Sequence, residues 1–519
     1  MPPIPVELPL AVDRAAPASL TVQLGDRLRE AIRGGALAPG ERLPSTRALA
    51  RQLAVSRTVV TDAYQQLYAE GWIEGRHGSG TYVADLGPSW RAAPAGPAVP
   101  GGRGAAGRAD GPARDRPGGS GVAGASGAAS AAGAEDRCGT APPDGGSRTA
   151  GRRDGRGRTG PDGRAVIDLR PGRPWVRDYD EAAWRRAWRA AADLPPGDEP
   201  DPYGLPRLRE ELARHLRRAR TVPAGPENIM VTRGTGNGLD LVAATVLRPG
   251  DRVGVEDPGW SRARTILAGR GAEIVPCPVD ADGVIVEELP ADLRLLYTTP
   301  AHQYPLGGRL PVARRERLLA WARRSGALVV EDDYDAEFRY DVAPLPALYG
   351  LDPARVVLLG TLSKSLSPDI GVGWLVAAPD LLAAVARTRR ELTDRTSGPA
   401  QQAVAVLLER GDLDRHLRRM RRQYARRRAA LVAALGSRVT GDTAGLHVMI
   451  ELPGHEAGPL VEAARARGVL LDSTGRHHHG PPGRHGLVIG YGSASLAQVR
   501  QGAAILAHLL GTGLAETAE

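Results

Sequence analysis

The sequence predicts two folded domains of different class, a small N-terminal α+β module and a large C-terminal α/β domain. Residues 21–85 alternate short helical patterns with turns, whereas residues 165–519 alternate apolar strand-like runs with helical patterns. Between them, residues 86–164 hold mostly Gly, Ala, Pro and Arg with almost no large apolar side chain, which predicts a disordered linker. Residues 1–20 form an N-terminal tail. A chain of 519 residues is long enough for this division.

The composition excludes several classes of protein. Hydrophobic residues make up 42% and charged residues 24%, and no apolar run approaches the roughly 18 residues of a membrane span. No secretory signal is recognisable at the start, so we expect a cytoplasmic protein. Cys138 and Cys277 lack metal-ligand spacing, so neither a disulfide framework nor a metal site is expected. The net charge of +9 permits a polyanionic partner.

Lys364 is the only lysine in the chain, and nearly every other cation is an arginine. Most surface positions accept either residue, but imine formation with an aldehyde requires a primary amine that a guanidinium cannot supply. Lys364 is therefore a candidate for chemistry, and a leftover surface residue is the alternative.

The N-terminal module has the pattern of a helix-turn-helix with a wing. Apolar residues at i, i+4 and i+8 predict a first helix along Leu24, Leu28 and Ile32. Ser45 and Ser56 are placed as N-caps of two further short helices, separated by a turn. The segment GWIEGRHGSGTYV then predicts two strands around a glycine tip.

Arginines near the N-termini of these helices can meet phosphates and base edges of double-stranded DNA. The expected DNA contacts are Arg42, Ser45, Arg47, Ser56, Arg57, Thr58, His77 and Gly78. A protein-binding helical bundle is the alternative from pattern alone. The run PGERLPSTRALARQLAVSRTVVTDAYQQLYAEGWIEGRHGSGTYV, however, resembles the winged-helix domain of the GntR superfamily almost end to end. The resemblance implies DNA-facing roles for Arg47, Arg57, Thr58, His77 and Gly78.

In the large domain, Lys364 follows a strand-like run in LLGTLSKSLSP, where it could form a Schiff base with pyridoxal 5′-phosphate (PLP). The segment VTRGTGNGLDL predicts a strand-to-helix turn that could hold the phosphate through Gly234, Thr235 and Gly236. In EDDYDAEFRY, Asp332 could keep the pyridine nitrogen protonated and Tyr334 could bond the ring phenolate. In VEDPGWSRAR, Trp260 could stack on the ring. Each segment alone has an ordinary alternative: a common turn, a solvated strand end or a core tryptophan.

Together these segments resemble fold-type I PLP-dependent enzymes of the aspartate aminotransferase group. TTPAHQYPLGGRLP, LGTLSKSLSP and HLRRMRRQYARRRAAL match one branch more closely, and with the GntR-type winged helix the whole is similar to the MocR family of transcriptional regulators. The resemblance implies a head-to-tail homodimer with PLP on Lys364. It also implies that His302 and Gln303 line the cofactor and that Thr361 and Ser363 assist with its phosphate.

One departure from the pattern of fold-type I PLP proteins lies after the lysine, where Gly371 occupies the position of an arginine that usually pairs with the phosphate. Its loss weakens the expected phosphate binding, and Asp369 nearby adds repulsion. We consider Arg233 and Arg262 as substitute donors.

For a ligand carboxylate, the family analogy points to Arg262 and to a second arginine in the C-terminal part, Arg484 or Arg476. A surface arginine is the alternative for each C-terminal candidate. The tract His477-His478-His479 has no acidic or cysteine neighbours in sequence, so a mobile loop is expected rather than a metal site.

These observations predict a DNA-binding transcriptional regulator that senses PLP, an amine or an amino acid, with no physiological turnover expected. An effector amine would displace Lys364 and shift the balance between two dimer conformations. A genuine aminotransferase with a DNA-binding appendage is the first alternative. A plain repressor that has lost PLP, suggested by Gly371, is the second.

Overall fold

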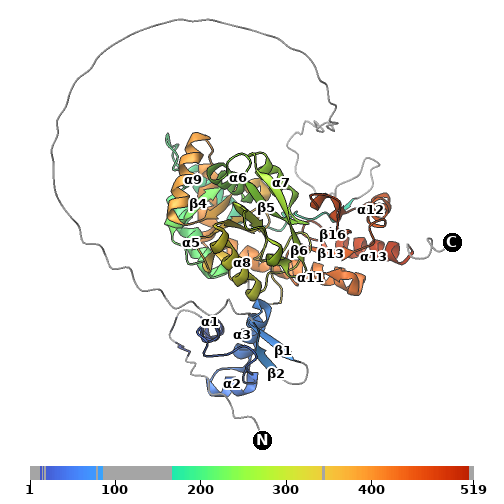
Figure 1. Ribbon diagram of the computed structural model, residues 1–519. Helices are drawn as coiled ribbons and strands as arrows, with labels where there is room; N and C mark the ends of the chain where they lie inside the picture. Colours follow the sequence, from blue (N-terminus) through green and yellow to red (C-terminus); the bar gives the residue numbers. More distant parts are fainter. Residues whose placement is uncertain are drawn as a thin grey trace, which may run out of the picture. The chain divides into compact units, whose positions relative to one another are not determined.

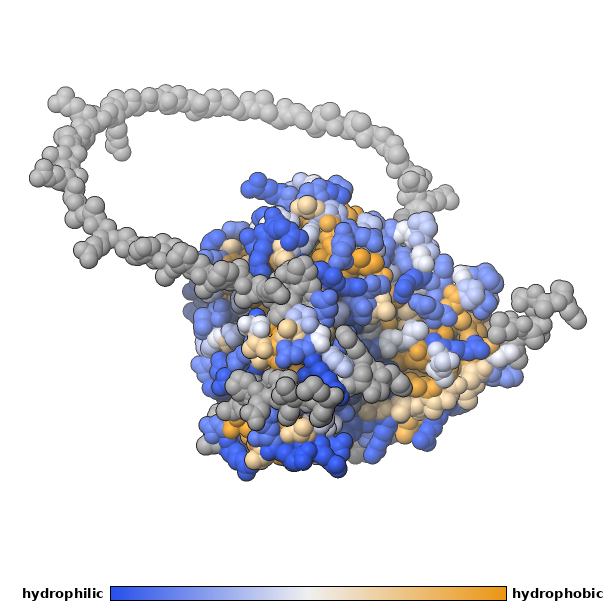
Figure 2. Space-filling view, turned by 60° about the horizontal axis from the view of Figure 1, so that its bottom comes forward, coloured by the Kyte–Doolittle hydropathy of each residue, from blue (hydrophilic) through white to orange (hydrophobic). Residues whose placement is uncertain are grey.

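The protein is described from a computed structural model. The structure describes residues 12–14, 16, 19–76, 80–85, 166–341 and 345–512. The predicted linker at 86–164, the wing residues His77 and Gly78, and Cys138 therefore lie outside the described residues. In the described part, no helix combines the length and the apolar character needed to cross a membrane. The face drawn in Figure 2 is largely hydrophilic, with smaller apolar patches between polar side chains.

The N-terminal module contains three helices followed by a two-stranded antiparallel sheet (Figure 1). Its elements are α1 (Leu20–Arg33), α2 (Thr46–Gln52), α3 (Arg57–Glu70), β1 (Ile73–Arg76) and β2 (Gly80–Val83). The predicted caps are present, because Ser45 Oγ accepts from Ala48 N at 3.2 Å and Ser56 Oγ accepts from Val59 N at 3.4 Å. The helix α3 ends at Gly71, whose φ of 86° is readily available to glycine.

An apolar core holds the three helices and the wing together. The stripe predicted along α1 is fully buried. It packs with side chains from α2, α3, β1 and β2, including Leu49, Val60, Leu67, Trp72 and Val83. The exposed faces of α2 and α3 carry the arginines, so this core positions the candidate DNA contacts.

The large domain is built on an eight-stranded sheet of order β4-β11-β10-β9-β8-β5-β6-β7. Its strands are β4 (Ile229–Thr232), β5 (Arg252–Asp257), β6 (Glu273–Asp280), β7 (Gly283–Val284), β8 (Leu295–Thr298), β9 (Leu328–Asp333), β10 (Val356–Thr361) and β11 (Gly373–Val376). The apolar runs that the sequence indicates as strands, at 228–231, 252–255, 294–297, 327–330 and 356–359, correspond to β4, β5, β8, β9 and β10, whose ends differ from the runs by no more than three residues. Only β11 and β7 run antiparallel to their neighbours. The other six strands consequently point the same way.

Helices cover both faces of the sheet (Figure 1). On β10, Val357 and Leu359 belong to a core shared with α6 (Thr235–Val246), α7 (Ser261–Ala268) and α9 (Pro379–Glu391). Val356 and Leu358 alternate with them and belong to a second core. That core includes α4 (Glu181–Ala192), α5 (Pro206–Arg220), α8 (Val312–Ser325) and α10 (Gly398–Glu409). Burial on both faces explains why these strands are continuous apolar runs.

A smaller C-terminal part contains a four-stranded sheet of order β12-β13-β16-β15. Its elements are β12 (Val439–Thr440), β13 (His447–Glu451), α12 (Ala457–Ala466), β14 (Val469–Leu470), β15 (Asp472–Ser473), β16 (Gly486–Gly490) and α13 (Leu496–Thr512). The short strand β3 (Ile167–Asp168) pairs with β14, so the chain that follows the linker joins this part first.

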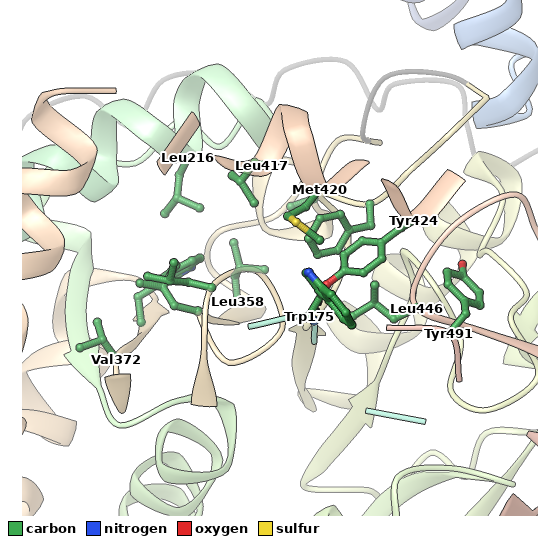
Figure 3. Close-up of a cluster of buried hydrophobic side chains, with 14 of the residues drawn as sticks. Trp175, Leu216, Leu358, Val372, Leu417, Met420, Tyr424, Leu446 and Tyr491 are labelled. Atoms are coloured by element: carbon green, nitrogen blue, oxygen red, sulfur yellow. Dashed lines mark hydrogen bonds between the residues drawn. The ribbon is translucent and has the colours of Figure 1, made fainter. Parts of the chain in front are cut away.

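The long helix α11 (Asp412–Leu435) connects the two parts of the domain through a buried layer. Figure 3 shows Trp175 beside Tyr424 and Met420 of α11. The backbone N of Trp175 donates to Tyr424 Oη at 2.8 Å, and the guanidinium of Arg427 lies 4.4 Å over the Trp175 ring. This layer fixes the segment 169–176, which carries Gly172 to the candidate site described next.

Candidate functional site

The candidate cofactor residues gather at one edge of the large sheet. The strands β4, β5, β8, β9 and β10 are mutually parallel, so their carboxyl ends share this edge. In open α/β sheets, ligands bind in the crevice outside these ends. Lys364, Asp332 and Trp260 follow or end β10, β9 and β5, and Gly234 lies between β4 and α6. Residues that are up to 130 positions apart in sequence are thus brought to one place.

Lys364 is half-buried, and its Nζ donates to the carbonyl of Gly172. Burial lowers the pKa of the ammonium, and the charges of Arg262 and Arg173 lower it further. Asp335 and Asp332 act in the opposite direction. The Gly172 contact could not be predicted from the sequence, since the two residues are 192 positions apart. A lowered pKa increases the fraction of neutral amine, the nucleophilic form.

Asp332 is buried beneath this edge with one carboxylate oxygen free among the described residues. Its Oδ2 accepts from Tyr297 Oη at 2.6 Å, whereas its Oδ1 has no hydrogen-bond partner. Burial raises the pKa of Asp332 to about 7, although the Tyr297 hydrogen bond lowers it in part. Buried acceptors are nearly always satisfied, so Oδ1 marks a place for a donor that the chain does not supply. A protonated pyridine nitrogen is such a donor.

Tyr334 is oriented by His302. Its Oη donates to the His302 carbonyl at 3.0 Å and lies 3.1 Å from Nδ1 of the same residue. That Nδ1 also lies 3.0 Å from Asp335 Oδ2, and His302 Nε2 is buried without a partner among the described residues. His447 joins this buried group, where one donor atom from each of His302, Asp335 and His447 falls within 4.8 Å of the others. The His447 Nε2 already faces the carbonyl of Pro305 at 3.1 Å.

Trp260 and the first turn of α6 form a wall beside Asp332. The Trp260 ring stacks on Tyr297 with centroids 6.1 Å apart and planes inclined at 29°. A Cβ added to Gly236 would lie 3.7 Å from the Trp260 ring, so glycine keeps this approach open. Tyr297, which bonds Asp332, therefore also contacts the Trp260 ring, so the carboxylate and the aromatic plate lie near each other.

A second group of residues surrounds the N-terminus of α6. Gly234 has a φ of 108°, and a Cβ there would lie 3.3 Å from Thr361 Oγ1. Thr361 Oγ1 donates to Ser363 Oγ at 3.0 Å, and Thr235 begins the helix. Free N–H groups of a helix N-terminus with adjacent hydroxyls suit a phosphate. This end of the site fits the phosphate group of PLP through neutral donors.

The phosphate end has a glycine at position 371 instead of an arginine, and the two substitute donors differ in whether they are already paired. Gly371 has a φ of 58°, and a Cβ there would meet nothing within 4 Å. Arg233 pairs with Asp394 instead. Arg262 is exposed, forms no ion pair within the described ranges, and is close enough to Lys364 to lower its pKa. Of the two substitute donors considered, only Arg262 is available.

Two predicted residues are engaged elsewhere. Arg484 pairs with Glu451 Oε1 at 3.2 Å, and the structure does not bring it to the other candidates. Its alternative, Arg476, pairs with Asp472 and is close enough to Tyr304 to lower the pKa of that phenol against the effect of burial.

Gln303 has a supporting position beside the loop that carries His302. It is fully buried, and its Nε2 donates to Glu256, to the Pro258 carbonyl and to the Tyr304 carbonyl. Its Oε1 accepts from Leu306 N at 3.0 Å. All its polar atoms are therefore occupied by the protein itself, and the place of Gln303 beside the cofactor stays a prediction.

Glu256 is a site-supporting residue that sequence reasoning missed. It is buried at the end of β5 and accepts from Thr298 Oγ1, Thr299 N and Thr299 Oγ1, at 2.5, 3.1 and 2.6 Å. Burial raises its pKa above the ordinary value. Through these bonds and Gln303 it joins the Trp260 loop to the loop that carries His302. The one signal in the sequence that could have indicated Glu256 is its position as an acidic residue directly after the apolar run of β5.

The histidine tract is packed against the large domain instead of forming a loop apart from it. His477 is buried, its carbonyl accepts from Gly259 N at 2.9 Å, and burial lowers its pKa to about 3. Arg264 of α7 donates to the carbonyls of residues 476, 477 and 478. The expectation of a mobile loop was therefore wrong, because tertiary contacts that sequence does not reveal bury the tract.

The candidate DNA residues lie on the outer surface of α2 and α3. Arg42, Ser45, Arg47, Ser56, Arg57 and Thr58 are exposed. Arg57 Nε donates to Thr46 Oγ1 at 3.3 Å, which links the two helices of the motif. A Cβ on Gly80 would lie 3.0 Å from Arg42 Nε, so Arg42 lies beside the wing. The arrangement presents a cationic surface suited to phosphates.

The fold and the site define a class of protein, a DNA-binding winged helix joined to an aminotransferase-like domain. Residues 20–83 match the family model of bacterial regulatory proteins of the gntR family, and residues 181–479 match aminotransferase class I and II. The chain is 33% identical to the HTH-type pyridoxine biosynthesis transcriptional regulator PdxR of Corynebacterium glutamicum, over 94% of this chain and 95% of that protein. It is 34% identical to the probable rhizopine catabolism regulatory protein MocR of Rhizobium meliloti, over 95% and 94%. The chain belongs to the MocR family of GntR-type transcriptional regulators.

Solved aminotransferases share the fold of the large domain. An archaeal alanine:glyoxylate aminotransferase matches with a TM-score of 0.62 and 28% identity, covering 68% of this chain and 92% of that chain. The α-aminoadipate aminotransferase LysN of Thermus thermophilus, solved with N-(5′-phosphopyridoxyl)-L-leucine, matches with a TM-score of 0.60 and 26% identity, covering 68% and 93%. These matches confirm the predicted fold-type I class.

Proposed function

We propose that this DNA-binding regulator binds PLP through Lys364 in its aminotransferase-like domain and senses PLP, an amine or an amino acid. When bound, PLP supplies an aldehyde that reacts reversibly with primary amines. We further propose a cytoplasmic homodimer that binds a DNA operator. The family relationship and the two regions that match family models support this proposal.

The observation that carries the proposal is Asp332 Oδ1, which has no hydrogen-bond partner in the part of the chain that the structure describes, beside the half-buried Lys364. The two residues end neighbouring strands, β9 and β10. An ionisable carboxylate with a raised pKa and an amine with a lowered pKa form the pair of groups expected at a functional site. The geometry supports the proposal independently of these pKa shifts, because Trp260 and the N-terminus of α6 form the walls of the same site.

Each residue has a distinct task in this proposal. Asp332 holds a proton on the ring nitrogen, and Trp260 excludes water from one ring face. Gly234 and Thr361 hold the phosphate through N–H and hydroxyl groups. Lys364 supplies the amine, and Asp335 lies close enough to stabilise its ammonium after an effector amine has replaced it.

Sensing then requires that the effector bind two conformations of the protein unequally. The coupling to DNA affinity equals that difference, commonly about 1–3 kcal/mol or roughly 5- to 150-fold. An effector without such a difference would bind and change nothing.

The test is an absorbance titration of the purified protein with PLP. We expect a saturable band that Lys364→Ala abolishes, followed by a change in duplex DNA affinity when amines or amino acids are added. Unaltered spectra on addition of PLP would favour a plain repressor. The Lys364→Ala variant also serves as the control for PLP held without a covalent bond.

The intact ring end of the site favours one further candidate, a genuine aminotransferase. Keto acid release from amino donors at about 1–1000 per second would support it. A regulator with residual turnover would release keto acid far below this range.

A further inference from the structure

The outer face of α11 is a row of arginines, and we infer that this row contacts the phosphodiester backbone of DNA, as a second DNA-binding surface outside the winged helix. Residues 415–435 contain eight arginines and no acidic residue. Arg415 pairs with Asp412, and the structure divides the other seven arginines into an inner and an outer set. This inference rests on the DNA-binding function of the protein.

The inner arginines attach the helix to the rest of the domain through backbone carbonyls. Arg421 donates to the Glu337 carbonyl at 2.7 Å, and Arg428 donates to the Asp442 carbonyl at 3.1 Å. The buried Arg427 donates to the Gly492 carbonyl at 2.8 Å, and Arg419 donates to the Asp178 carbonyl. These four side chains are accounted for by the packing of the domain.

The outer arginines have no such explanation. Arg418, Arg422 and Arg426 are exposed, and their spacing of i, i+4 and i+8 places them on one side of α11. None of them forms a hydrogen bond or ion pair within the part of the chain that the structure describes. The nearest acid is Asp414, whose pKa Arg418 helps to lower, but Asp414 already pairs with Arg218.

A merely solvated helix face would alternate charges, because like charges at i and i+4 destabilise a helix. This face carries two such like-charged pairs in succession, Arg418 with Arg422 and Arg422 with Arg426. The three side chains span about 12 Å along the helix axis. A DNA strand presents a phosphate about every 3.4 Å of its axis, so the row covers the rise of roughly three phosphates. DNA is the polyanion that a regulator of this family binds.

The salt dependence of DNA affinity tests the inference without knowledge of the operator. Each phosphate contact contributes about −0.9 to the slope of log K against log salt. The full chain and the triple variant R418Q/R422Q/R426Q are titrated with a random-sequence duplex of about 60 base pairs between 50 and 200 mM salt. We expect the magnitude of the slope to fall by about 2.7, because each of the three lost contacts removes about 0.9. A slope of about 0.9 corresponds to a roughly eightfold change in affinity for each tenfold change in salt concentration.

Two matched variants distinguish the effect of the arginine row from the effect of a lower net charge. R324Q/R387Q/R500Q removes the same charge from three exposed arginines on α8, α9 and α13, and it should leave the slope within about 0.9 of the parent value. R418K/R422K/R426K should retain the parent slope, which would exclude a structural effect. Melting temperatures verify that each variant is folded.

Equal slopes for the row variant and the scattered variant would overturn the inference, and so would a row variant whose slope matches the parent. Failure of the parent protein to bind any duplex would instead contradict the DNA-binding function itself. The three single variants provide a second measurement, because each should reduce the magnitude of the salt slope by about 0.9.

Discussion

Replacing Asp332 by Asn should stabilise the cofactor-free protein at alkaline pH while weakening PLP binding. The pKa of Asp332 rises from 3.8 to about 7 on folding, because the carboxyl is buried and, among the described residues, accepts a single hydrogen bond. A raised pKa means that the folded state favours the protonated acid. The favourable contribution is fully present below about pH 4 and is lost as the pH rises through about 7. At pH 8 the ionised carboxylate therefore destabilises the cofactor-free fold by about 4 kcal/mol.

Asn keeps the shape of the side chain and removes the charge. We expect the melting temperature of cofactor-free Asp332→Asn to exceed that of the parent at pH 8, and the two to converge near pH 4. Titration with PLP should show the opposite effect. A hydrogen bond between charged groups contributes about 1.5–3 kcal/mol, so its loss should weaken PLP binding by about 10- to 150-fold.

The neighbouring Asp333 provides a matched control of opposite sign. Its two carboxylate oxygens bind the buried Arg220 at 2.7 and 2.9 Å. Asp333→Asn should destabilise the protein by about 3–5 kcal/mol at neutral pH, because a buried guanidinium loses its counter-ion. The reasoning about the site is refuted if cofactor-free Asp332→Asn melts below the parent at pH 8, or if it binds PLP as tightly as the parent does.

Four further predictions address the other parts of the protein. Arg57→Ala should abolish specific DNA binding in a mobility-shift assay and leave the PLP absorbance unchanged; loss of both would mean that the two domains are wrongly assigned. Leu28→Ala should destabilise the N-terminal module by about 2–5 kcal/mol through a core cavity, measured as loss of DNA binding on heating before the large domain melts. Gly371→Arg, which enters open space, should tighten PLP binding up to about tenfold after the cost of the left-handed backbone, and unchanged affinity in the spectral titration would exclude that side of the pocket. Arg264→Ala should increase hydrogen exchange in the segment 474–478, because Arg264 holds the carbonyls of residues 476, 477 and 478, and unaltered exchange would contradict this role.

The sequence was sufficient for the strands and for the candidate residues at their carboxyl ends. Apolar runs buried on both faces are distinctive, and Lys364 and Asp332 each lie close to the end of one. The caps Ser45 and Ser56 were equally predictable, because capping is a local interaction between a side chain and the next turn. Features that depend on near neighbours in sequence were recovered.

Features that depend on distant segments were not. The carbonyl of Gly172 accepts from Lys364, and the amide of Gln303 is used by Glu256 and nearby carbonyls. Neither pattern of contacts leaves a periodic trace in the sequence. The burial of His477 has the same origin, since Gly259 and Arg264 bind its carbonyl from another part of the domain. Side chains were therefore identified more readily than the role that packing assigns to them.

The two ends of the candidate site differ in a way that suits a sensor. At the ring end, Asp332, Tyr297 and Trp260 are all present and buried or half-buried. At the phosphate end, Gly371 leaves open space where the family usually has a guanidinium, and Arg262 is the only candidate of the two to remain unpaired in the described part. Specific recognition of the ring with a weaker hold on the phosphate makes occupancy depend on free PLP concentration, because a loosely held ligand exchanges with solution. An enzyme that must retain its cofactor gains nothing from this arrangement, whereas a regulator gains a response to PLP itself.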